Sequence, residues 1–238
     1  MRPTQRVTMP ATAAIVTLAF LAACGPSNPS AGPSAPSAPA SPSPSAGASS
    51  SPDPARHEEI RAMVEAARLS PRQLGVKKPS SEETTFSLTV PCRLDLEANY
   101  VAAHYWSYRD AKVDLVAHSV FGFDPQRGAD VIAQIKTALT SCRSTWTYGD
   151  SIRMKPAGEL RVRRPAGVDG HLAYCHRGTV ISGRTKGDTV YLCDGLVSRG
   201  SLVASVSTVE LTLAAAQAEL KKAIPLAAAA LVRAVPVS

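Results

Sequence analysis

Residues 171–209 read HLAYCHRGTVISGRTKGDTVYLCDGLVSRGSLVASVSTV, and this segment gives the clearest prediction of the architecture. It contains three apolar runs rich in β-branched residues, at about 171–182, 189–198 and 201–209, separated by short glycine-containing turns. Runs of this length and composition predict strands, and turns this short join strands that pair antiparallel. We therefore expect a three-stranded antiparallel meander at the centre of the protein.

The two cysteines of this meander are expected to pair with each other. A hairpin centred at residue 184, within a turn-like stretch, places Cys175 opposite Cys193. Four cysteines allow three connectivities, and this geometry selects the one that leaves Cys92 to pair with Cys142. On a loop-entropy model, closing loops of about 18 and about 50 residues stabilises the fold by roughly 3 and 4 kcal/mol.

Three helices are expected around the sheet. The first begins at Asp53-Pro54, an N-cap followed by proline at the first helical position, and ends near Leu69. The second covers about 125–141, and the third extends from about residue 212 to residue 234. Pro225 is expected to kink the third helix. Its charged residues, Glu219, Lys221 and Lys222, argue against a membrane span.

Further strands are expected before and between the helices. They lie at 85–90, 100–108 and 113–123, with a hairpin turn at 109–112, and shorter candidates lie at 144–154 and 159–164. Together, these strands, helices and cysteines predict an α+β fold. In it, a mainly antiparallel sheet of about five to seven strands packs against two or three helices and is braced by two disulfides.

The N-terminus has the form of a bacterial lipoprotein leader. Arg2 and Arg6 precede a 12-residue apolar stretch from Ala11 to Ala22, which is too short to span a bilayer core of roughly 30 Å. The region closes on Leu21-Ala22-Ala23-Cys24, which resembles a lipobox. We expect cleavage before Cys24 and a palmitate-bearing diacylglyceryl group on its thiol, so that the protein is lipid-anchored on the extracytoplasmic face of the cell membrane. An ordinary secretory signal is the alternative, and it would leave one cysteine unexplained.

Residues 25–54 form a tether in this interpretation. They comprise 10 Ser, 9 Pro, 6 Ala, 3 Gly, one Asn and one Asp, so none brings a large apolar side chain to a core. The chain is thus divided into a signal peptide at 1–23, a lipidated cysteine with a disordered linker at 24–54, and a folded domain at 55–238. Loss of the two leader arginines lowers the formal charge from +7 to +5.

With these elements placed, two segments resemble the PknH-like extracellular sensor domain, a family found on actinobacterial receptor kinases and lipoproteins. Residues 129–142 are similar to the family's helix ending in Cys, and residues 193–206 are similar to its Cys followed by a β-hairpin. The resemblance covers about 55–238 and implies a secreted sensor with a cleft for an extracellular ligand. Leu139 stands where the family tends to have Trp, and Val209 and Glu210 stand where it tends to have its last Cys. The resemblance supplies no ligand identity and no catalytic residue.

Eight of the twelve aromatic residues fall between positions 100 and 148. Amphipathic rings suit a cleft for sugars, lipids or small apolar ligands, and the candidate lining residues are Tyr100, Trp106, Tyr108 and Trp146. Strand alternation would set Tyr100, Trp106 and Tyr108 on one face of the sheet and Tyr105 on the other. The alternative is that these rings pack the sheet against its helices.

Residues 153–164 carry the strongest local charge, a net +4. The cations are Arg153, Lys155, Arg161, Arg163 and Arg164, against Glu159. Such a surface would contact anionic lipid headgroups, wall phosphates or an acidic partner. The alternative is an edge hairpin whose charges discourage aggregation. Nucleic acid is not an expected partner outside the cell.

No metal, cofactor or catalytic constellation is expected. His104 and His118 face each other if their hairpin turns at residue 111, yet no carboxylate or thiol is placed to complete a set of metal ligands. His171 and His176 are five residues apart, so a regular strand sends them to opposite faces. The sequence contains no Gly-x-Ser-x-Gly and no glycine-rich phosphate loop, so an enzyme is not expected.

The sequence therefore favours a membrane-anchored extracytoplasmic lipoprotein that acts as a non-enzymatic ligand-binding or sensing module. The alternative is a cell-wall-associated interaction or structural lipoprotein that uses the basic surface at 153–164, and a hydrolase stands third. A closed apolar cleft with few polar groups would favour the first, and a flat basic face the second. A buried His–carboxylate pair beside an exposed Ser would favour the hydrolase.

Overall fold

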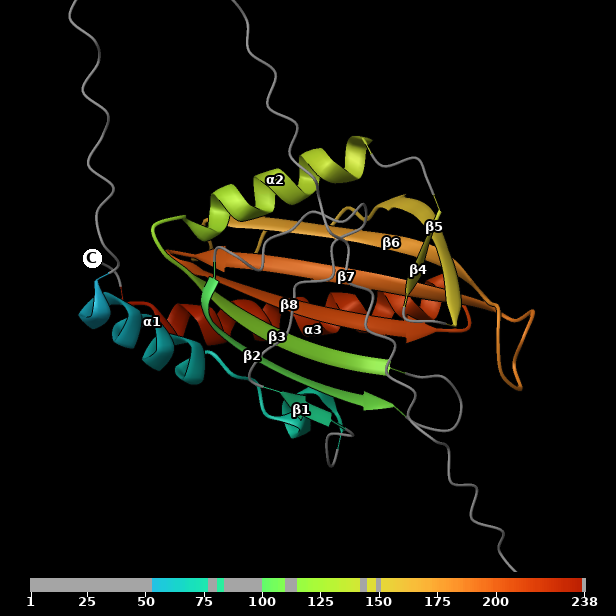
Figure 1. Cartoon of the computed structure of the whole chain (residues 1–238), viewed down its shortest axis with the longest axis horizontal. Coiled ribbons are helices and arrows are strands. Elements are labelled where there is room, and N and C mark those ends of the chain that lie inside the picture. Colours follow the sequence, from blue (N-terminus) through green and yellow to red (C-terminus); the bar gives the residue numbers. More distant parts are fainter. Residues whose placement is uncertain are drawn as a thin grey trace, which may run out of the picture. The chain divides into compact units, whose positions relative to one another are not determined.

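An antiparallel sheet forms the centre of the structure, which is a computed structural model (Figure 1). The structure describes residues 53–76, 81–83, 100–109, 115–141, 145–148 and 151–236. Within them the sheet has eight strands in the order β1-β2-β3-β8-β7-β6-β5-β4. The strands are β1 (Ser81–Glu83), β2 (Tyr100–Arg109), β3 (Leu115–Phe123), β4 (Trp146–Tyr148), β5 (Ile152–Glu159), β6 (Gly170–Val180), β7 (Thr189–Arg199) and β8 (Leu202–Glu210).

The predicted meander is confirmed as β6, β7 and β8, which are neighbours in the sheet. Cys175 and Cys193 are directly paired in the β6–β7 register, and their sulfurs are bonded at 2.07 Å. The hairpin geometry read from the sequence therefore predicted this disulfide correctly. Cys92 and Cys142 lie outside the described residues, and their pairing stays a prediction.

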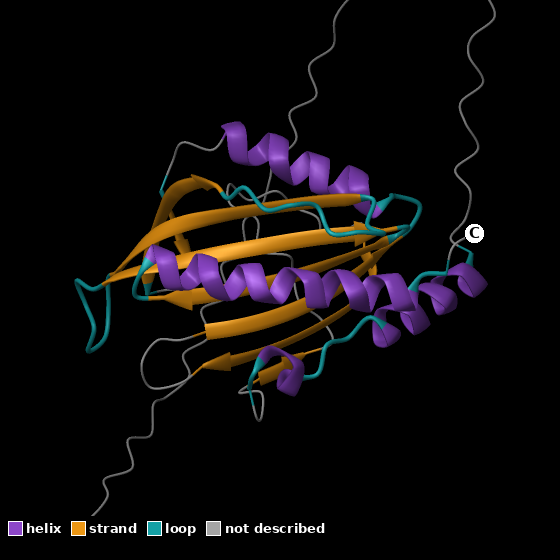
Figure 2. Cartoon of the chain, turned by 180° about the vertical axis from the view of Figure 1, so that it is seen from behind, coloured by secondary structure: helices purple, strands orange, loops and turns teal. Residues whose placement is uncertain are grey.

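In the part of the chain that the structure describes, three α-helices surround the sheet, as expected: α1 (Pro54–Ala66), α2 (Gly128–Ser141) and α3 (Leu213–Ala234). The predicted N-cap is confirmed, because the Asp53 side chain accepts a hydrogen bond from the Ala55 amide at 3.0 Å. Helix α1 ends at Ala66, before the expected Leu69, and a 3₁₀ turn, η1 (Pro71–Leu74), follows it. Helix α3 continues through Pro225 as one element (Figure 2).

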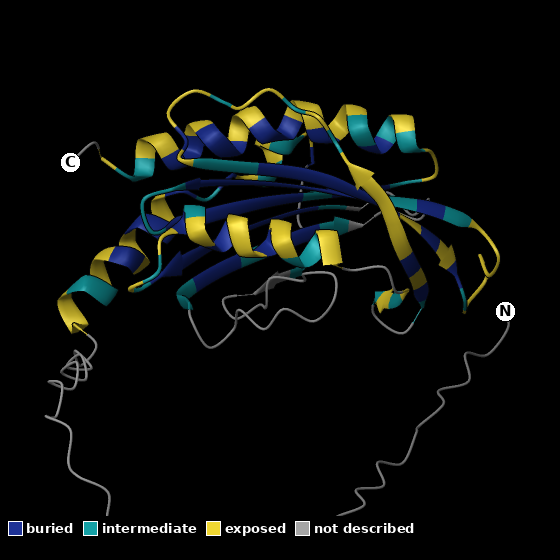
Figure 3. Cartoon of the chain, turned by 90° about the horizontal axis from the view of Figure 1, so that it is seen from above, coloured by how far each residue is buried: buried dark blue, intermediate teal, exposed yellow. Residues whose placement is uncertain are grey.

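The two faces of the sheet carry different helices. Helices α1 and α3 pack on one face, which we call the α3 face, and α2 packs on the other, the α2 face (Figures 1 and 2). The buried side chains follow the strand alternation, so that along β8 Leu202, Ala204 and Val206 join the α3-face cluster while Val203 joins the α2-face cluster. A third cluster continues the α2 face toward β4 and β5. Figure 3 shows the strands buried between exposed helix surfaces.

Small residues let the helices of the α3 face approach the sheet closely. A Cβ at Gly195 would lie 2.6 Å from Cγ1 of Ile224, and one at Gly122 would lie 2.2 Å from Cγ2 of Ile60. These distances are shorter than side chains tolerate, so glycine at these two positions fixes how near α3 and α1 lie to the strands.

Several expectations are corrected or lie outside the described residues. Among the described residues the sheet has eight strands, one more than the upper end of the expected range of about five to seven, and residues 160–164 are not a strand. Instead, the chain leaves the sheet after the Leu160 amide bonds the Ala173 carbonyl, and Leu160 and Val162 pack against the α3-face cluster. The leader, Cys24, the linker up to residue 52, the strand at 85–90 and most of the turn at 109–112 lie outside the described residues. None of the helices that the structure describes is long and apolar enough to cross a membrane.

Candidate ligand-binding site

A pocket opens on the α2 face between α2 and the strands β5 and β6. Its volume is about 120 Å³. Helix α2 contributes Lys136, Leu139 and Thr140, β5 contributes Pro156, Gly158 and Glu159, and β6 contributes Leu172, Tyr174, Cys175 and His176. We call this the α2–β6 pocket. It is mostly apolar with a few polar groups, which is the usual composition of a small-molecule site.

A β-bulge in β5 shapes one wall of the pocket. The β5–β6 register shifts between Pro156 and Gly158, and Gly158 has a φ of 114°, which favours glycine. A bulge bends its strand and interrupts the ladder, and proline there has no amide hydrogen to lose. The sequence Pro-Ala-Gly therefore separates this part of β5 from regular pairing at the place where the pocket lies.

His176 is the polar group that the pocket leaves unsatisfied. Its side chain is only 1% exposed, yet neither ring nitrogen has a hydrogen-bond partner among the described residues. The edge of the Trp146 ring contacts it at a centroid distance of 4.4 Å, and the Tyr174 ring lies at 5.0 Å. Burial lowers the pKa of His176 from 6.5 to about 4, so the imidazole is neutral at pH 7 and offers one donor and one acceptor.

A second polar pair lies beside the pocket on the same face. Asp194 on β7 is directly opposite Tyr174 on β6 and opposite Ser207 on β8. The Ser207 hydroxyl donates to Oδ1 of Asp194 at 2.5 Å. Burial raises the pKa of Asp194 from 3.8 to about 7, although the Ser207 hydrogen bond acts in the opposite direction. Burial and the neighbouring Asp194 also raise the pKa of Tyr174.

Charged side chains meet at the rim of the pocket. Lys136 Nζ lies 3.3 Å from Glu159 Oε1, which links α2 to the end of β5 across the opening. Both side chains are more than half exposed, at 56% and 58%, so this ion pair contributes little to stability. A weak link at the rim is compatible with a ligand that enters between α2 and β5.

The predicted aromatic cleft is not formed as one surface. The β2–β3 register shifts between Tyr100 and Ala102, so Tyr100 packs with Phe121 on the α2 face, whereas Trp106 lies on the α3 face. There Trp106 is buried and its Nε1 donates to the Leu69 carbonyl at 2.8 Å. The expectation that Tyr100, Trp106 and Tyr108 share a face is therefore wrong, because the bulge reverses the alternation. Trp146 contacts His176 of the α2–β6 pocket, and Tyr100 packs against the α2-face cluster that includes Leu172 and Tyr174.

The histidines lie close to where the sequence placed them. The register pairs His104 with Val120 and His118 with Trp106, so the two histidines are diagonal neighbours on one face rather than direct partners. Burial, His104 and Arg68 lower the pKa of His118 to about 3. His171 bonds the Val162 carbonyl, away from His176, as expected. No cluster of three or more metal-ligating side chains occurs in the described part of the chain.

The basic residues divide into two groups. Arg153 and Lys155 alternate with buried Ile152 and Met154 on β5 and are exposed. Arg161, Arg163 and Arg164 lie in the loop after β5, and Arg163 and Arg164 face α3. The Arg164 guanidinium donates to the backbone carbonyls of Val168 and Asp169, so it also holds the loop.

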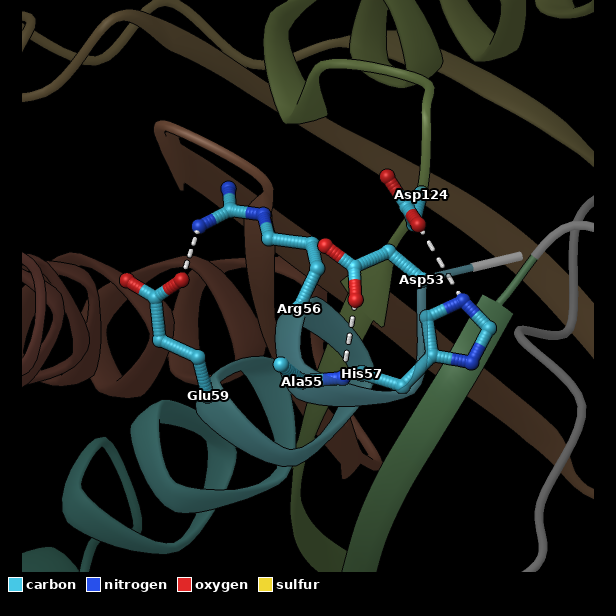
Figure 4. Close-up of polar contacts among 6 residues, drawn as sticks. All are labelled: Asp53, Ala55, Arg56, His57, Glu59 and Asp124. Carbon is cyan, nitrogen blue, oxygen red and sulfur yellow. Dashed lines mark hydrogen bonds and ion pairs between the residues drawn. The ribbon is translucent and has the colours of Figure 1, made fainter. Parts of the chain in front are cut away.

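A His–carboxylate pair occurs elsewhere in the fold, at the start of α1 (Figure 4). His57 Nε2 lies 3.1 Å from Asp124 Oδ2, and the two side chains are about one-fifth exposed, at 21% and 23%. Among the described residues no serine is hydrogen-bonded to this pair. The contact joins α1 to the connection between β3 and α2, where Asp124 precedes a cis proline.

No sequence pattern indicated the α2–β6 pocket directly. The sequence does place two of its lining residues together, because Tyr174 and His176 are two residues apart on β6 and therefore share a face of the sheet. Asp194 lies opposite Tyr174 in the same register that pairs Cys175 with Cys193.

Comparison with known proteins gives a remote structural likeness. No family model matches the chain, and no curated protein matches it. Among solved structures, it is similar to the crystal structure of the extracellular domain of PknH from Mycobacterium tuberculosis, at 11% sequence identity and a TM-score of 0.45. The match covers 69% of this chain and 95% of that chain. A likeness this remote says nothing about what either protein binds.

Proposed function

We propose that the protein is a lipid-anchored extracytoplasmic module that binds a small, uncharged and largely apolar ligand in the α2–β6 pocket. The leader, the lipobox-like cysteine and the Pro/Ser/Ala-rich tether support the anchored, extracytoplasmic part of this proposal. The pocket supports the binding part.

One observation carries the binding proposal: both ring nitrogens of His176 lack partners in a buried wall. A buried polar group without a hydrogen bond costs about 1–3 kcal/mol, so native structures rarely keep one without a reason. A ligand atom that accepts from one nitrogen or donates to the other would recover that free energy. The two neighbouring rings, Trp146 and Tyr174, fix the orientation of the imidazole toward such an atom.

The dimensions and charges of the pocket define the ligand class. Its volume of about 120 Å³ is comparable to cavities that hold one six-membered carbon ring. The neutral imidazole and the apolar side chains of Leu139 and Leu172 disfavour an ion, because a charge there would lose its hydration. The two charged lining residues, Lys136 and Glu159, pair with each other, so a bound ion would have to break that pair to gain a counter-charge. We therefore expect one ring or a short apolar segment that carries a single hydroxyl or carbonyl.

Two probes of the same shape test this proposal. Phenol and toluene differ by one hydroxyl in place of a methyl group, and their binding is measured by titration with NMR of the protein amides. Phenol should bind more tightly than toluene, by roughly 2- to 10-fold, because its hydroxyl pairs with His176. In His176→Phe the ring shape stays while both nitrogens are lost, so the preference for phenol should disappear.

A second variant separates the pocket from the rest of the surface. Leu139→Trp fills the opening from α2, so neither probe should shift the amides of β6 in that protein. The binding proposal fails if wild-type amides do not respond to either probe. It also fails if the preference for phenol survives in His176→Phe.

A further inference from the structure

The outer side of α3 is unusual in its exposed apolar side chains. The structure describes three large hydrophobic side chains as exposed: Leu211 at 52%, Leu226 at 37% and Val232 at 36%. All three belong to α3 or to the residues just before it. The inner side of the same helix is buried against the sheet, and Leu226 and Val232 are exposed on its outer side among charged residues. Exposed apolar side chains gathered on one element mark an interaction surface.

A groove runs between α3 and the loop that follows β5. Its volume is about 730 Å³. The apolar lining residues are Val162, Pro165, Ala166, Ile224, Pro225, Ala228, Ala229 and Val232, and the polar ones are Arg163 and Arg164. The lining is therefore mostly apolar and carries two arginines, of which Arg164 also donates to the Val168 and Asp169 carbonyls.

The same face of the molecule gathers exposed cations. Lys221 and Lys222 lie one turn before Pro225, and Arg233 follows Val232. Arg153, Lys155 and Arg177 extend the basic surface along the sheet, since alternation puts them on the face opposite to Met154 and His176. In contrast, each arginine of α1 that forms an ion pair does so with a glutamate of its own helix. Glu219, which pairs with Lys222 at 2.6 Å, neutralises one cation beside the groove.

From this combination we infer that the α3 face docks on a bilayer surface that contains anionic phospholipid. Guanidinium groups bind phosphate through paired hydrogen bonds, and lysines near the surface add long-range attraction. Leu226 and Val232 would enter the boundary between headgroups and acyl chains, as the apolar side of an interfacial helix does. A soluble polyanion would bind the cations but leave Leu226 and Val232 in water. An anionic bilayer would contact both the cations and these apolar side chains, so it fits the surface better.

Vesicle binding tests the inference without the lipid anchor. The chain from Gly25 to Ser238 lacks Cys24 and the leader but keeps every residue of the three described core clusters. It should sediment with vesicles of phosphatidylcholine and phosphatidylglycerol and stay in solution with phosphatidylcholine alone. Because this chain carries no lipid, the outcome does not depend on Cys24 or on the α2–β6 pocket.

Two matched charge variants locate the contact. Arg163→Gln with Lys221→Gln removes two cations beside the groove and should weaken binding to anionic vesicles by about 30-fold, at about 1 kcal/mol per charge. Arg184→Gln with Lys186→Gln removes the same charge from the exposed β6–β7 turn and should change binding little. Equal losses in the two variants would overturn the inference, because the attraction would then be a property of net charge.

A fluorescent variant tests whether the apolar side chains of α3 enter the bilayer. Leu226→Trp adds an indole at an exposed position, and brominated acyl chains quench indoles that reach the headgroup boundary. We expect quenching beyond that of the wild-type protein, whose Trp106 is buried and whose half-buried Trp146 packs against His176 on the α2 face, away from α3. Absence of that extra quenching, with binding to dextran sulfate as tight as to anionic vesicles, would mean that the face binds polyanions and not a bilayer.

Discussion

At the scale of single residues, the α2 face holds two buried titratable side chains, His176 and Asp194, whose shifted pKa values have opposite effects on how the free energy of unfolding depends on pH. Burial keeps His176 neutral, since its pKa falls to about 4, and keeps Asp194 protonated up to near neutrality, since its pKa rises to about 7. Between pH 6.5 and about 4 the unfolded chain binds a proton at His176 and the folded protein does not, so His176 destabilises the fold as the pH falls through this window. For Asp194 the sign is reversed: its contribution is full below pH 3.8 and is lost as pH rises to 7.

We predict that Asp194→Asn abolishes the decrease in the free energy of unfolding that Asp194 causes between pH 3.8 and about 7. In the wild type, the unfolded state ionises above pH 3.8 while the folded carboxyl stays protonated to about pH 7, so the free energy of unfolding falls across this window. An amide of the same shape does not ionise and still accepts from the Ser207 hydroxyl. The advantage of the variant over the wild type should therefore grow with pH, by at most about 4 kcal/mol, and level off above pH 7.

Urea denaturation at a series of pH values measures this difference. Asp188→Asn, at an exposed carboxylate of the β6–β7 turn, is the matched control and should track the wild type. Parallel curves for Asp194→Asn and the wild type between pH 4 and 7 would show that Asp194 is ionised in the folded protein.

Some of this residue-scale chemistry could be predicted from the sequence. Alternation along β6 places Tyr174 and His176 on one face, and the expectation that His171 points the other way was correct. The missing partners of His176 could not be predicted, because they depend on which side chains of α2 and β5 fill the space above it. The diagonal placement of His104 and His118 depends on a hairpin register that no residue of the turn specifies.

At the scale of elements, the packing of α3 on β7 depends on Gly195. We predict that Gly195→Ala destabilises the fold by about 1–3 kcal/mol, since the new methyl group would overlap Ile224 and force α3 away from the sheet. Its Cβ would lie 2.6 Å and 2.7 Å from Cγ1 and Cδ1 of Ile224, and 3.1 Å from Cδ1 of Leu220. Thermal or urea unfolding measures the loss.

A double-mutant cycle assigns the effect to this contact. Ile224→Ala alone leaves a cavity and should cost about 2–5 kcal/mol. In the Gly195→Ala background it should cost clearly less, because the added methyl group occupies part of the vacated space. Additive losses in the double variant would mean that the strain at Gly195 comes from somewhere other than α3.

The elements themselves were largely predictable, and the exceptions come from bulges. Apolar periodicity located the meander, both hairpin strands and all three helices to within a few residues. The register shifts at Tyr100/Ala102 and at Pro156/Gly158 were missed, and each changed a conclusion. The first moved Tyr100 to the face opposite Trp106, and the second shapes a wall of the α2–β6 pocket, which no sequence pattern indicated.

At the scale of the whole molecule, the two faces of one sheet offer two independent surfaces. The α2 face holds the α2–β6 pocket, and the α3 face holds the apolar and basic groove. Because β6 contributes to one face through His176 and to the other through Arg177, a ligand and a membrane would contact the same strand from opposite sides. The disulfide between Cys175 and Cys193 holds β6 and β7 together at that place.

Attachment of the whole molecule to the membrane should depend on Cys24. We predict that radiolabelled palmitate enters the wild-type protein in its host and that Cys24→Ala abolishes the label. Cys142→Ala is the matched control, because it removes a different thiol and should keep the label. Label that persists in Cys24→Ala, or that disappears in Cys142→Ala as well, would contradict lipidation at Cys24.

A salt wash separates this anchor from docking through the α3 face. Attraction between exposed cations and anionic headgroups decreases as salt shortens the screening length from roughly 10 Å at 0.1 M to 3 Å at 1 M. Two or more acyl chains hold through apolar contact, which salt does not weaken. The wild-type protein should therefore stay with the membrane fraction in high salt, whereas the unlipidated chain from Gly25, added to the same membranes, should be released. Release of both would mean that the surface charges, and no lipid, hold the protein in place.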